Sequence, residues 1–262
     1  MSRYPRLAAT ALLLLATILT ACTTTQVVER PLDDALLDAK VLDVIRKNPA
    51  AVLEALQAHQ REQQAAAQKA EEAALAARLA QLDLATVAAG APTRGAPDGK
   101  LLLIEFSDFQ CPFCARAQAT IDELMRKHGQ DVTLVFKHLP IAQIHPEAVP
   151  AARAAWAAQQ QGRFWEYHDL LFGAQEALAA DSYAAFAKTL KLDLARFERD
   201  RTGEASAAAV ERDLALANSL GIQGTPFFLV NREPVSGAVP LARSEAALAN
   251  ARAAPTAAPV AP

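Results

Sequence analysis

The sequence has few cysteines, few aromatic residues and no excess of basic charge. Its 262 residues include three cysteines, too few for a disulfide scaffold or a four-cysteine zinc site. Lysine and arginine number 26 against 29 acidic residues, so the formal net charge of -3 argues against nucleic acid as a partner. Aromatic residues make up 6%, whereas alanine is abundant, and alanine is the best helix former. We therefore expect a largely helical protein of one or two domains.

An apolar run near the amino terminus, residues 7–19, is too short to span a bilayer as a helix. It follows two arginines and precedes the small residue Ala21, which is the pattern of a secretory signal. The four residues that end in Cys22 resemble the bacterial lipoprotein box, in which the cysteine is lipidated and becomes the new amino terminus. The resemblance implies a signal peptide over residues 1–21 and a lipid anchor at Cys22. An ordinary signal, with Cys22 present by chance, is the alternative.

This export signal predicts a protein of the cell envelope, outside the cytoplasm, where disulfides persist. The residue after Cys22 is Thr23. In some bacteria an aspartate at this position favours retention in the inner membrane, so threonine favours sorting to the outer membrane. Residues 22–32 read as a polar tether.

Residues 33–86 are expected to form a helical stalk. Apolar residues recur at helical spacing before Asn48, and no glycine or further proline interrupts the chain from Pro49 to about residue 85. The apolar residues of this second helix gather at its two ends, so it cannot bury a continuous stripe alone. We expect it to associate with copies of itself as a coiled coil, giving a homo-oligomer. A solvated spacer is the alternative. Glycine and proline then mark a linker over residues 87–99.

The remaining chain predicts an α/β domain over residues 100–252, with a disordered tail over residues 253–262. Two buried strands flank a helix and form a βαβ unit, a long helical stretch follows, and a strand, a turn and a closing helix end the domain. The expected ranges are 101–106, 115–128 and 132–136 for the βαβ unit, 147–220 for the helical stretch, and 227–230 and 244–252 for the last strand and helix.

Cys111 and Cys114 stand two residues apart, directly after the first expected strand and at the start of a helix. The helix N-terminus favours negative charge, so the pKa of Cys111 is expected to be low and its thiolate to attack disulfides. Cys114 lies one helical turn on and can resolve the mixed disulfide. Half of a zinc site is one alternative, although no histidine pair has zinc spacing, so no metal or cofactor is predicted. A structural disulfide is another, but so small a loop gains little chain entropy.

Thr225 and Pro226 precede the last expected strand. Here the sequence resembles the thioredoxin superfamily, in which a cis-proline loop faces the Cys-x-x-Cys helix and binds the substrate peptide. The resemblance implies that Thr225 and Pro226 face the substrate, together with Phe113. A proline that only initiates a strand is the alternative.

A closer resemblance, over roughly residues 100–252, is to the DsbA-type thiol-disulfide oxidoreductases. It rests on residues 104–114, on residues 162–171 and on residues 221–226. This family inserts an all-helical domain into the thioredoxin fold, which matches the helical stretch at about residues 147–220. The implied fold is therefore a thioredoxin fold with an inserted helical domain, preceded by the N-terminal stalk.

Two residues of this motif bear on the chemistry. Strongly oxidising members carry histidine where this chain has Phe113, so the resemblance implies a weaker oxidant. The family also has a glutamate near the buried resolving cysteine, which implies that Glu105 tunes or relays the proton of Cys114, with Lys137 placed to approach it. A solvent-facing Glu105 is the alternative. No chemistry is assigned to Asp108 or Gln110.

The sequence thus predicts an exported, lipid-anchored thiol-disulfide oxidoreductase acting on exported proteins and reset by a membrane redox partner. Residues 48–56 resemble the amino-terminal region of the oligomeric suppressor-of-copper-sensitivity C proteins. Oligomeric members tend to isomerise disulfides, so isomerase or reductase is favoured over oxidase. A structural or binding lipoprotein that uses the domain as a module is the alternative, and copper(I) held by the two thiols is a third possibility.

Overall fold

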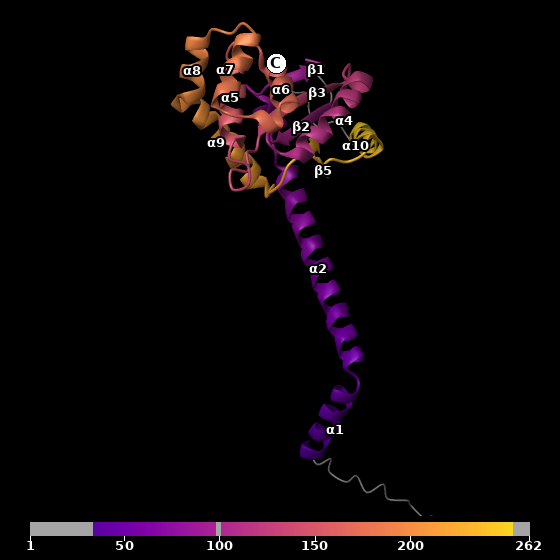
Figure 1. Cartoon of the computed structure of the whole chain (residues 1–262). Coiled ribbons are helices and arrows are strands. Elements are labelled where there is room, and N and C mark those ends of the chain that lie inside the picture. Colours follow the sequence, from indigo (N-terminus) through magenta and orange to yellow (C-terminus); the bar gives the residue numbers. More distant parts are fainter. Residues whose placement is uncertain (1–33, 98–100, 254–262) are drawn as a thin grey trace, which may run out of the picture. The chain divides into compact units, whose positions relative to one another are not determined.

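The computed structural model of the chain describes residues 34–97 and 101–253 (Figure 1). The chain divides into two compact units, Met1–Gln63 and Gln64–Pro262. The predicted signal peptide, the lipidation site Cys22, the tether and the tail beyond residue 253 lie outside the described residues. Within the described ranges, no helix combines the length and the apolar character that a membrane span requires.

The described part of the first unit is helical, as predicted. Helix α1 (Asp34–Lys47) precedes α2 (Pro49–Ala80), which begins in the first unit and ends in the second. The Asn48 side chain donates to the Val44 carbonyl oxygen at 2.8 Å, and Pro49 has no N–H with which to continue α1. Asn48 therefore closes α1 while Pro49 opens α2.

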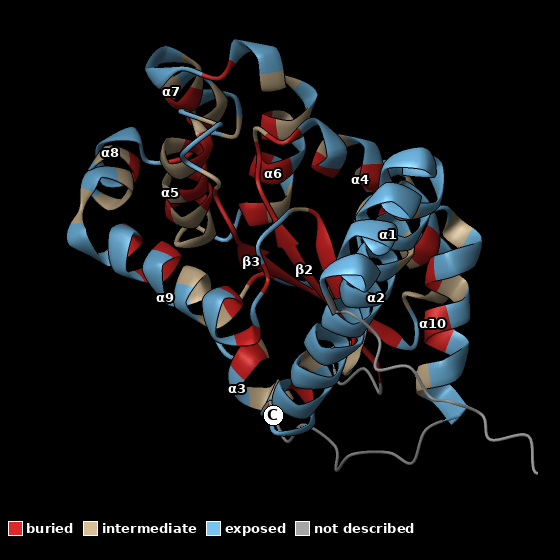
Figure 2. Cartoon of the chain, turned by 90° about the horizontal axis from the view of Figure 1, so that it is seen from below, coloured by how far each residue is buried: buried red, intermediate tan, exposed pale blue. Residues whose placement is uncertain are grey.

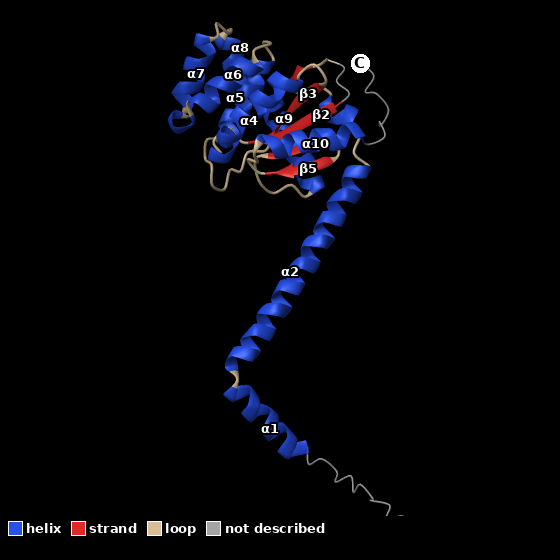
Figure 3. Ribbon diagram, turned by 90° about the vertical axis from the view of Figure 1, so that its right-hand side faces the viewer, coloured by secondary structure: helices blue, strands red, loops and turns tan. Residues whose placement is uncertain are grey.

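The second unit contains a five-stranded sheet in the order β1-β3-β2-β4-β5. Figure 3 shows the strands of this sheet among the helices. β2 and β3 run parallel, and the other neighbours are antiparallel. Every residue of β2 and β3 is buried, as expected for apolar strands covered on both faces. The strands are β1 (Thr93–Gly95), β2 (Leu101–Ser107), β3 (Val132–His138), β4 (Phe227–Val230) and β5 (Glu233–Ser236).

The helices follow the predicted thioredoxin plan. α4 (Pro112–His128) joins β2 to β3, and α10 (Leu241–Ala253) follows β5. The predicted helical insertion is present between β3 and β4 as five α-helices and the short 3-10 helix η1 (Gln175–Ala177). These five are α5 (Ala148–Gln159), α6 (Phe164–Gly173), α7 (Ala180–Thr189), α8 (Leu194–Thr202) and α9 (Glu204–Leu220).

Helices cover both faces of the sheet. On one face, α4 and α10 pack on alternate residues of the strands, including Leu103 and Leu134. On the other face, α9 packs with the end of α2 and with α3 (Leu84–Ala88) on Ile104 and its neighbours. A separate aromatic core fills the helical insertion. Figure 2 shows β2 and β3 buried among these helices.

The structure differs from the expected linker over residues 87–99. Thr93–Gly95 forms the edge strand β1, which pairs antiparallel with β3, and Val87 is buried in the core. The Arg232 side chain donates to the carbonyl oxygens of Leu79 and Leu82, at 3.0 and 2.9 Å, and so caps the end of α2. The folded domain therefore begins within α2, well before residue 100.

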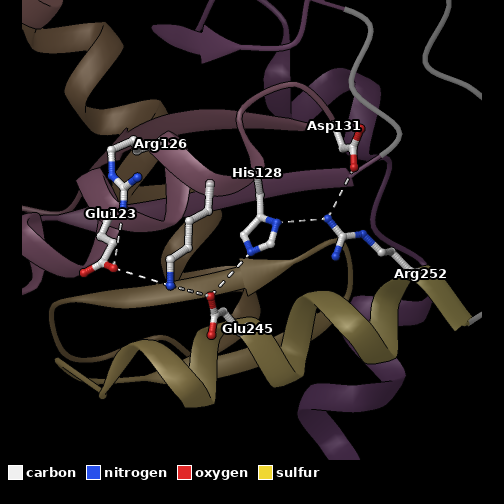
Figure 4. A network of polar contacts seen from close by, with 7 residues as sticks. Glu123, Arg126, His128, Asp131, Glu245 and Arg252 are labelled. Carbon is white, nitrogen blue, oxygen red and sulfur yellow. Dashed lines mark hydrogen bonds and ion pairs between the residues drawn. The ribbon is translucent and has the colours of Figure 1, made fainter.

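A surface network of charged side chains joins α4 to α10 (Figure 4). Glu245 of α10 lies 3.2 Å from Lys127 and 3.6 Å from His128. Arg252 reaches Asp131, just beyond α4, at 3.4 Å. Exposed ion pairs contribute little each, so this network orients α10 against α4 more than it stabilises the fold.

Candidate active site

The two cysteines lie at the start of α4, as the sequence predicts. Cys111 is the residue before the helix, Pro112 occupies the first turn, and the Cys114 N–H donates to the Cys111 carbonyl at 3.1 Å. Both cysteines are free thiols. Cys111 is 4% exposed and Cys114 is 0% exposed, so an approaching disulfide meets Cys111 first.

The surroundings of the two thiols drive their pKa values apart. A hydrogen bond from the Cys114 side chain, with smaller contributions from Thr225 and from backbone N–H groups, lowers the pKa of Cys111 to about 5. Burial raises the pKa of Cys114 far above that of a free thiol, and the neighbouring Cys111 raises it further. At neutral pH Cys111 is therefore a reactive thiolate, whereas Cys114 remains a protonated thiol.

The loop before β4 faces the nucleophile. The peptide bond between Thr225 and Pro226 is cis, and the Cys111 thiol lies 3.6 Å from the Thr225 carbonyl oxygen. Thr225 is partly exposed, whereas Pro226 is buried. Thr225 lies 114 positions beyond Cys111, and the antiparallel pairing of β4 with β2 brings the two together.

Phe113 lies on the outer side of the motif. Its side chain is 53% exposed, and the Arg116 guanidinium stands 4.3 Å from the ring centroid. An exposed aromatic ring next to the nucleophile offers an apolar contact for a bound peptide. Its position agrees with the expected role of Phe113 in substrate binding, which remains a prediction.

Glu105 is fully buried, so the alternative of a solvent-facing side chain is wrong. The Gln118 side chain of α4 donates to its Oε1 at 3.0 Å, which places Glu105 on the face of the sheet that α4 covers. Burial raises the pKa of Glu105. A raised pKa means that the carboxyl group of Glu105 holds its proton more readily than an exposed glutamate does.

The expected approach of Lys137 to Glu105 is also wrong. Lys137 pairs in register with Phe106, so its side chain lies on the opposite face of the sheet from Glu105. There its Nζ donates to Asp213 of α9 at 3.0 Å. Glu105 therefore has a different charged neighbourhood from the one that the resemblance implied.

Three polar residues for which the sequence predicts no chemistry hold the loop between β2 and α4 in place. Asp108 accepts a hydrogen bond from the Ile141 N–H at 2.9 Å and lies 2.7 Å from the His145 ring. Gln110 accepts from the Glu147 N–H at 2.7 Å. Gln175 donates to the carbonyl oxygens of residues 109 and 111 at 2.7 and 3.0 Å.

These contacts tie the loop to the helical insertion. In the sequence, the only indication that Asp108 and Gln110 act at the site is that they lie in the polar stretch immediately before the Cys-x-x-Cys motif. No sequence pattern indicates a role for Gln175.

Among the residues that the structure describes, no three His, Cys, Asp or Glu side chains gather in a way that could hold a metal ion.

The low pKa of Cys111 predicts how the reduced protein responds to pH. Alkylation of Cys111 by iodoacetamide should rise with pH through a midpoint at about 5, where an unperturbed thiol has its midpoint near 9. The unfolded thiol holds a proton that the folded thiolate lacks, so the reduced protein should gain stability as the pH rises from about 5 to about 9.

Mass spectrometry of the alkylated peptide gives the pH midpoint of Cys111 alkylation. Urea unfolding at several pH values gives the dependence of stability on pH. Cys111→Ser should remove the early alkylation and flatten the stability profile. A wild-type midpoint near 9 would contradict the assignment of Cys111 as a thiolate.

A thioredoxin fold that presents a reactive thiolate next to a buried second thiol is suited to thiol-disulfide exchange. The fold and the pair of thiols are those of the thioredoxin superfamily. The profile of the DSBA-like thioredoxin domain matches residues 102–249, more than half of the chain. The chain belongs to this family.

Known proteins resemble different shares of the chain. A thioredoxin-like oxidoreductase from Silicibacter pomeroyi superposes with a TM-score of 0.59 at 30% identity, over 66% of this chain and 100% of its own. A linker-deletion variant of Proteus mirabilis ScsC superposes with a TM-score of 0.62 over 87% of this chain and 99% of its own, at 22% identity, and so shares the fold.

Among curated proteins, the Na(+)/H(+) antiporter NhaA of Herminiimonas arsenicoxydans is 40% identical over 144 residues. The match covers 55% of this chain but only 23% of the antiporter. The chain therefore spans about a quarter of the length of this curated relative.

Proposed function

We propose that the protein is an exported, lipid-anchored oxidoreductase that exchanges disulfides with exported proteins through Cys111, Pro112, Phe113 and Cys114. The observation that carries the proposal is the pair of thiols at the start of α4. Cys111 has a pKa lowered to about 5 and faces the Thr225 carbonyl, while Cys114 lies buried behind it. Cys111 attacks, and Cys114 releases the product.

The motif supports a weak oxidant. No imidazole occupies the third motif position, and the exposed Phe113 ring offers no hydrogen bond to the Cys111 thiolate. A thiolate that is less stabilised makes the disulfide less oxidising. We therefore favour isomerisation or reduction over oxidation, with a membrane redox partner that returns the pair to the dithiol.

Self-association through the N-terminal helices would suit isomerisation, since several active sites could hold one misfolded substrate. In the described part of the chain, most of the exposed large apolar side chains belong to the first unit. Those of the first unit are Leu36, Leu37, Val41, Leu42, Val44, Ile45, Leu53 and Leu56. Burial against the same helices of other copies would remove them from water.

Export and lipidation rest on the sequence pattern that ends at Cys22. A periplasmic thioredoxin-like protein from Salmonella enterica serovar Typhimurium has a similar structure, at 25% identity and a TM-score of 0.54. A location in the cell envelope would keep substrate disulfides stable.

The proposed function is tested by refolding of a scrambled ribonuclease, with Cys22 replaced by serine so that the protein is soluble. The wild-type chain should sediment as an oligomer and reactivate the ribonuclease. A variant with Leu53→Glu and Leu56→Glu should sediment as a monomer and lose most of this reactivation while still reducing insulin, because charges oppose burial of the helix faces.

Gln60→Glu with Gln63→Glu is the matched control, since it adds the same charge at exposed polar positions of the same helix. A wild-type chain that neither reactivates ribonuclease nor reduces insulin would refute the proposed function. A monomeric wild type that isomerises normally would refute the role of self-association.

A further inference from the structure

The side chain of Gln175 reaches the two-cysteine motif from the helical insertion. Gln175 opens the short helix η1. Its amide nitrogen Nε2 donates to two carbonyl oxygens, that of Phe109 at 2.7 Å and that of Cys111 at 3.0 Å. The amide NH2 group has two N–H bonds, so it can serve both oxygens at once. One contact of the insertion therefore ends on the backbone of the nucleophile itself.

The carbonyl oxygen of Cys111 competes with the thiolate of the same residue for a donor. The Cys114 nitrogen lies 3.1 Å from this oxygen, and the Ala115 nitrogen lies 3.2 Å from it. The Cys114 N–H also lowers the pKa of Cys111, as does the Phe113 N–H. A donor that satisfies the Cys111 carbonyl from another side leaves the Cys114 N–H free to turn toward the sulfur, which favours the thiolate.

The Cys111 carbonyl also acts on the thiolate through its dipole. Its oxygen is the negative end of a peptide dipole and belongs to the same residue as the sulfur, so it opposes the charge of the thiolate. The Gln175 amide sets the positive end of an N–H bond against this oxygen. Cys111 is nearly buried, so water screens these dipoles weakly. Removal of the amide would leave the oxygen without this compensation.

We propose that Gln175 is a positioning residue that stabilises the Cys111 thiolate, so that the helical insertion helps to set the reduction potential of the Cys111–Cys114 pair. This inference rests on the proposed function and adds to it a residue 64 positions beyond Cys111. Stabilising the thiolate stabilises the reduced pair, which makes its disulfide more oxidising. Gln175 thus supplies, through the backbone, part of the stabilisation that the Phe113 ring cannot supply.

Two charged groups stand close to Cys111 along the chain. The Asp108 carboxylate lies 2.7 Å from the His145 ring. The Arg116 guanidinium, on the first turns of α4, stands over an aromatic ring. In the described part of the chain, the polar contacts of these two groups do not involve Gln175. A change at Gln175 therefore leaves both charges in place, and a shift in the pKa of Cys111 reports the lost amide.

The test measures the pKa of Cys111 in the full, reduced chain. Iodoacetamide alkylation is followed across the pH range, and mass spectrometry of the peptide that contains Cys111 gives the midpoint. Gln175→Met keeps the length of the side chain and removes the donor. Its midpoint should rise by about one pH unit, the size of one hydrogen bond to a charged group. Gln175→Glu also places a negative charge there, so its midpoint should rise further.

The reduction potential should move in step with the midpoint. At pH 7 a rise of about one unit in the pKa of the thiolate destabilises the reduced pair about tenfold. The equilibrium of Gln175→Met with glutathione should therefore shift about tenfold toward the disulfide, a fall of about 30 mV.

Two further variants separate hydrogen bonding from packing. Gln175→Lys removes the amide but keeps a donor, so its midpoint should lie at or below that of the wild type. Gln161→Met removes another glutamine of the insertion that bridges backbone groups. The Gln161 side chain accepts from the Asp193 N–H at 2.8 Å and donates to the Asp193 carbonyl at 3.2 Å. This matched control should keep the midpoint and the potential of the wild type.

An equal midpoint in wild type and Gln175→Met would overturn the inference and leave the proposed function intact. A rise in Gln175→Lys as large as that in Gln175→Met, or a rise in Gln161→Met, would also overturn it, because the effect would then come from packing. A wild type whose pair forms no disulfide with glutathione would refute the proposed function, and the role of Gln175 with it.

Discussion

Replacement of Cys111 by serine is expected to reduce disulfide exchange to the uncatalysed rate, whereas replacement of Cys114 is expected to trap the substrate. Cys111 is the thiol whose pKa is lowered to about 5, so it alone supplies a thiolate at neutral pH. Without Cys114, the mixed disulfide on Cys111 has no internal thiol to resolve it. Insulin reduction measures the exchange, and non-reducing electrophoresis with mass spectrometry detects the trapped species.

The double variant with serine at both positions tests the alternative of a binding module. Cys114 is fully buried and Cys111 nearly so, so serine fits each site with little change of volume. Full biological function in the double variant would contradict an enzyme and favour a binding lipoprotein. Exchange by Cys111→Ser at the wild-type rate would show that another group is the nucleophile.

Replacement of Phe113 by histidine is expected to raise the reduction potential of the pair. A histidine there could donate to the Cys111 thiolate, and stabilising the thiolate favours the reduced form. One such bond, at about 1.4 kcal/mol, would raise the potential by about 30 mV, a tenfold change in the equilibrium constant. The measurement is equilibration with glutathione buffers followed by alkylation and mass spectrometry.

Phe113→Leu is the matched control, because it shortens the same exposed side chain and adds no donor. Its potential should stay close to that of the wild type. An unchanged or lower potential in Phe113→His would contradict the link between this position and a weak oxidant.

The parts of the fold that the sequence predicted depend on local patterns. The buried runs of β2 and β3 and the helix between them have distinct periodicities, and the two cysteines fall where the first strand meets the helix. Strand β1 was missed because it is only three residues long, on the sheet edge, within a segment rich in glycine and proline. Gly95 has φ of +99°, and such a residue signals a loop as readily as an edge strand.

The side-chain partners of Glu105 could not be predicted in this way. The choice between Lys137 and other partners depends on the register of β2 with β3, and a shift of one residue would reverse the face on which Lys137 lies. Gln175 comes from the helical insertion, 64 residues beyond Cys111, and reaches the site through tertiary packing alone.

The reduction potential of the Cys111–Cys114 pair in the wild-type chain tests the central claim most directly. We expect a single two-electron transition against glutathione, at about -180 mV or below, as for a pair that works in isomerisation or reduction. A potential near about -120 mV would contradict the proposed direction of exchange, and the absence of any Cys111–Cys114 disulfide across the glutathione range would contradict the site itself.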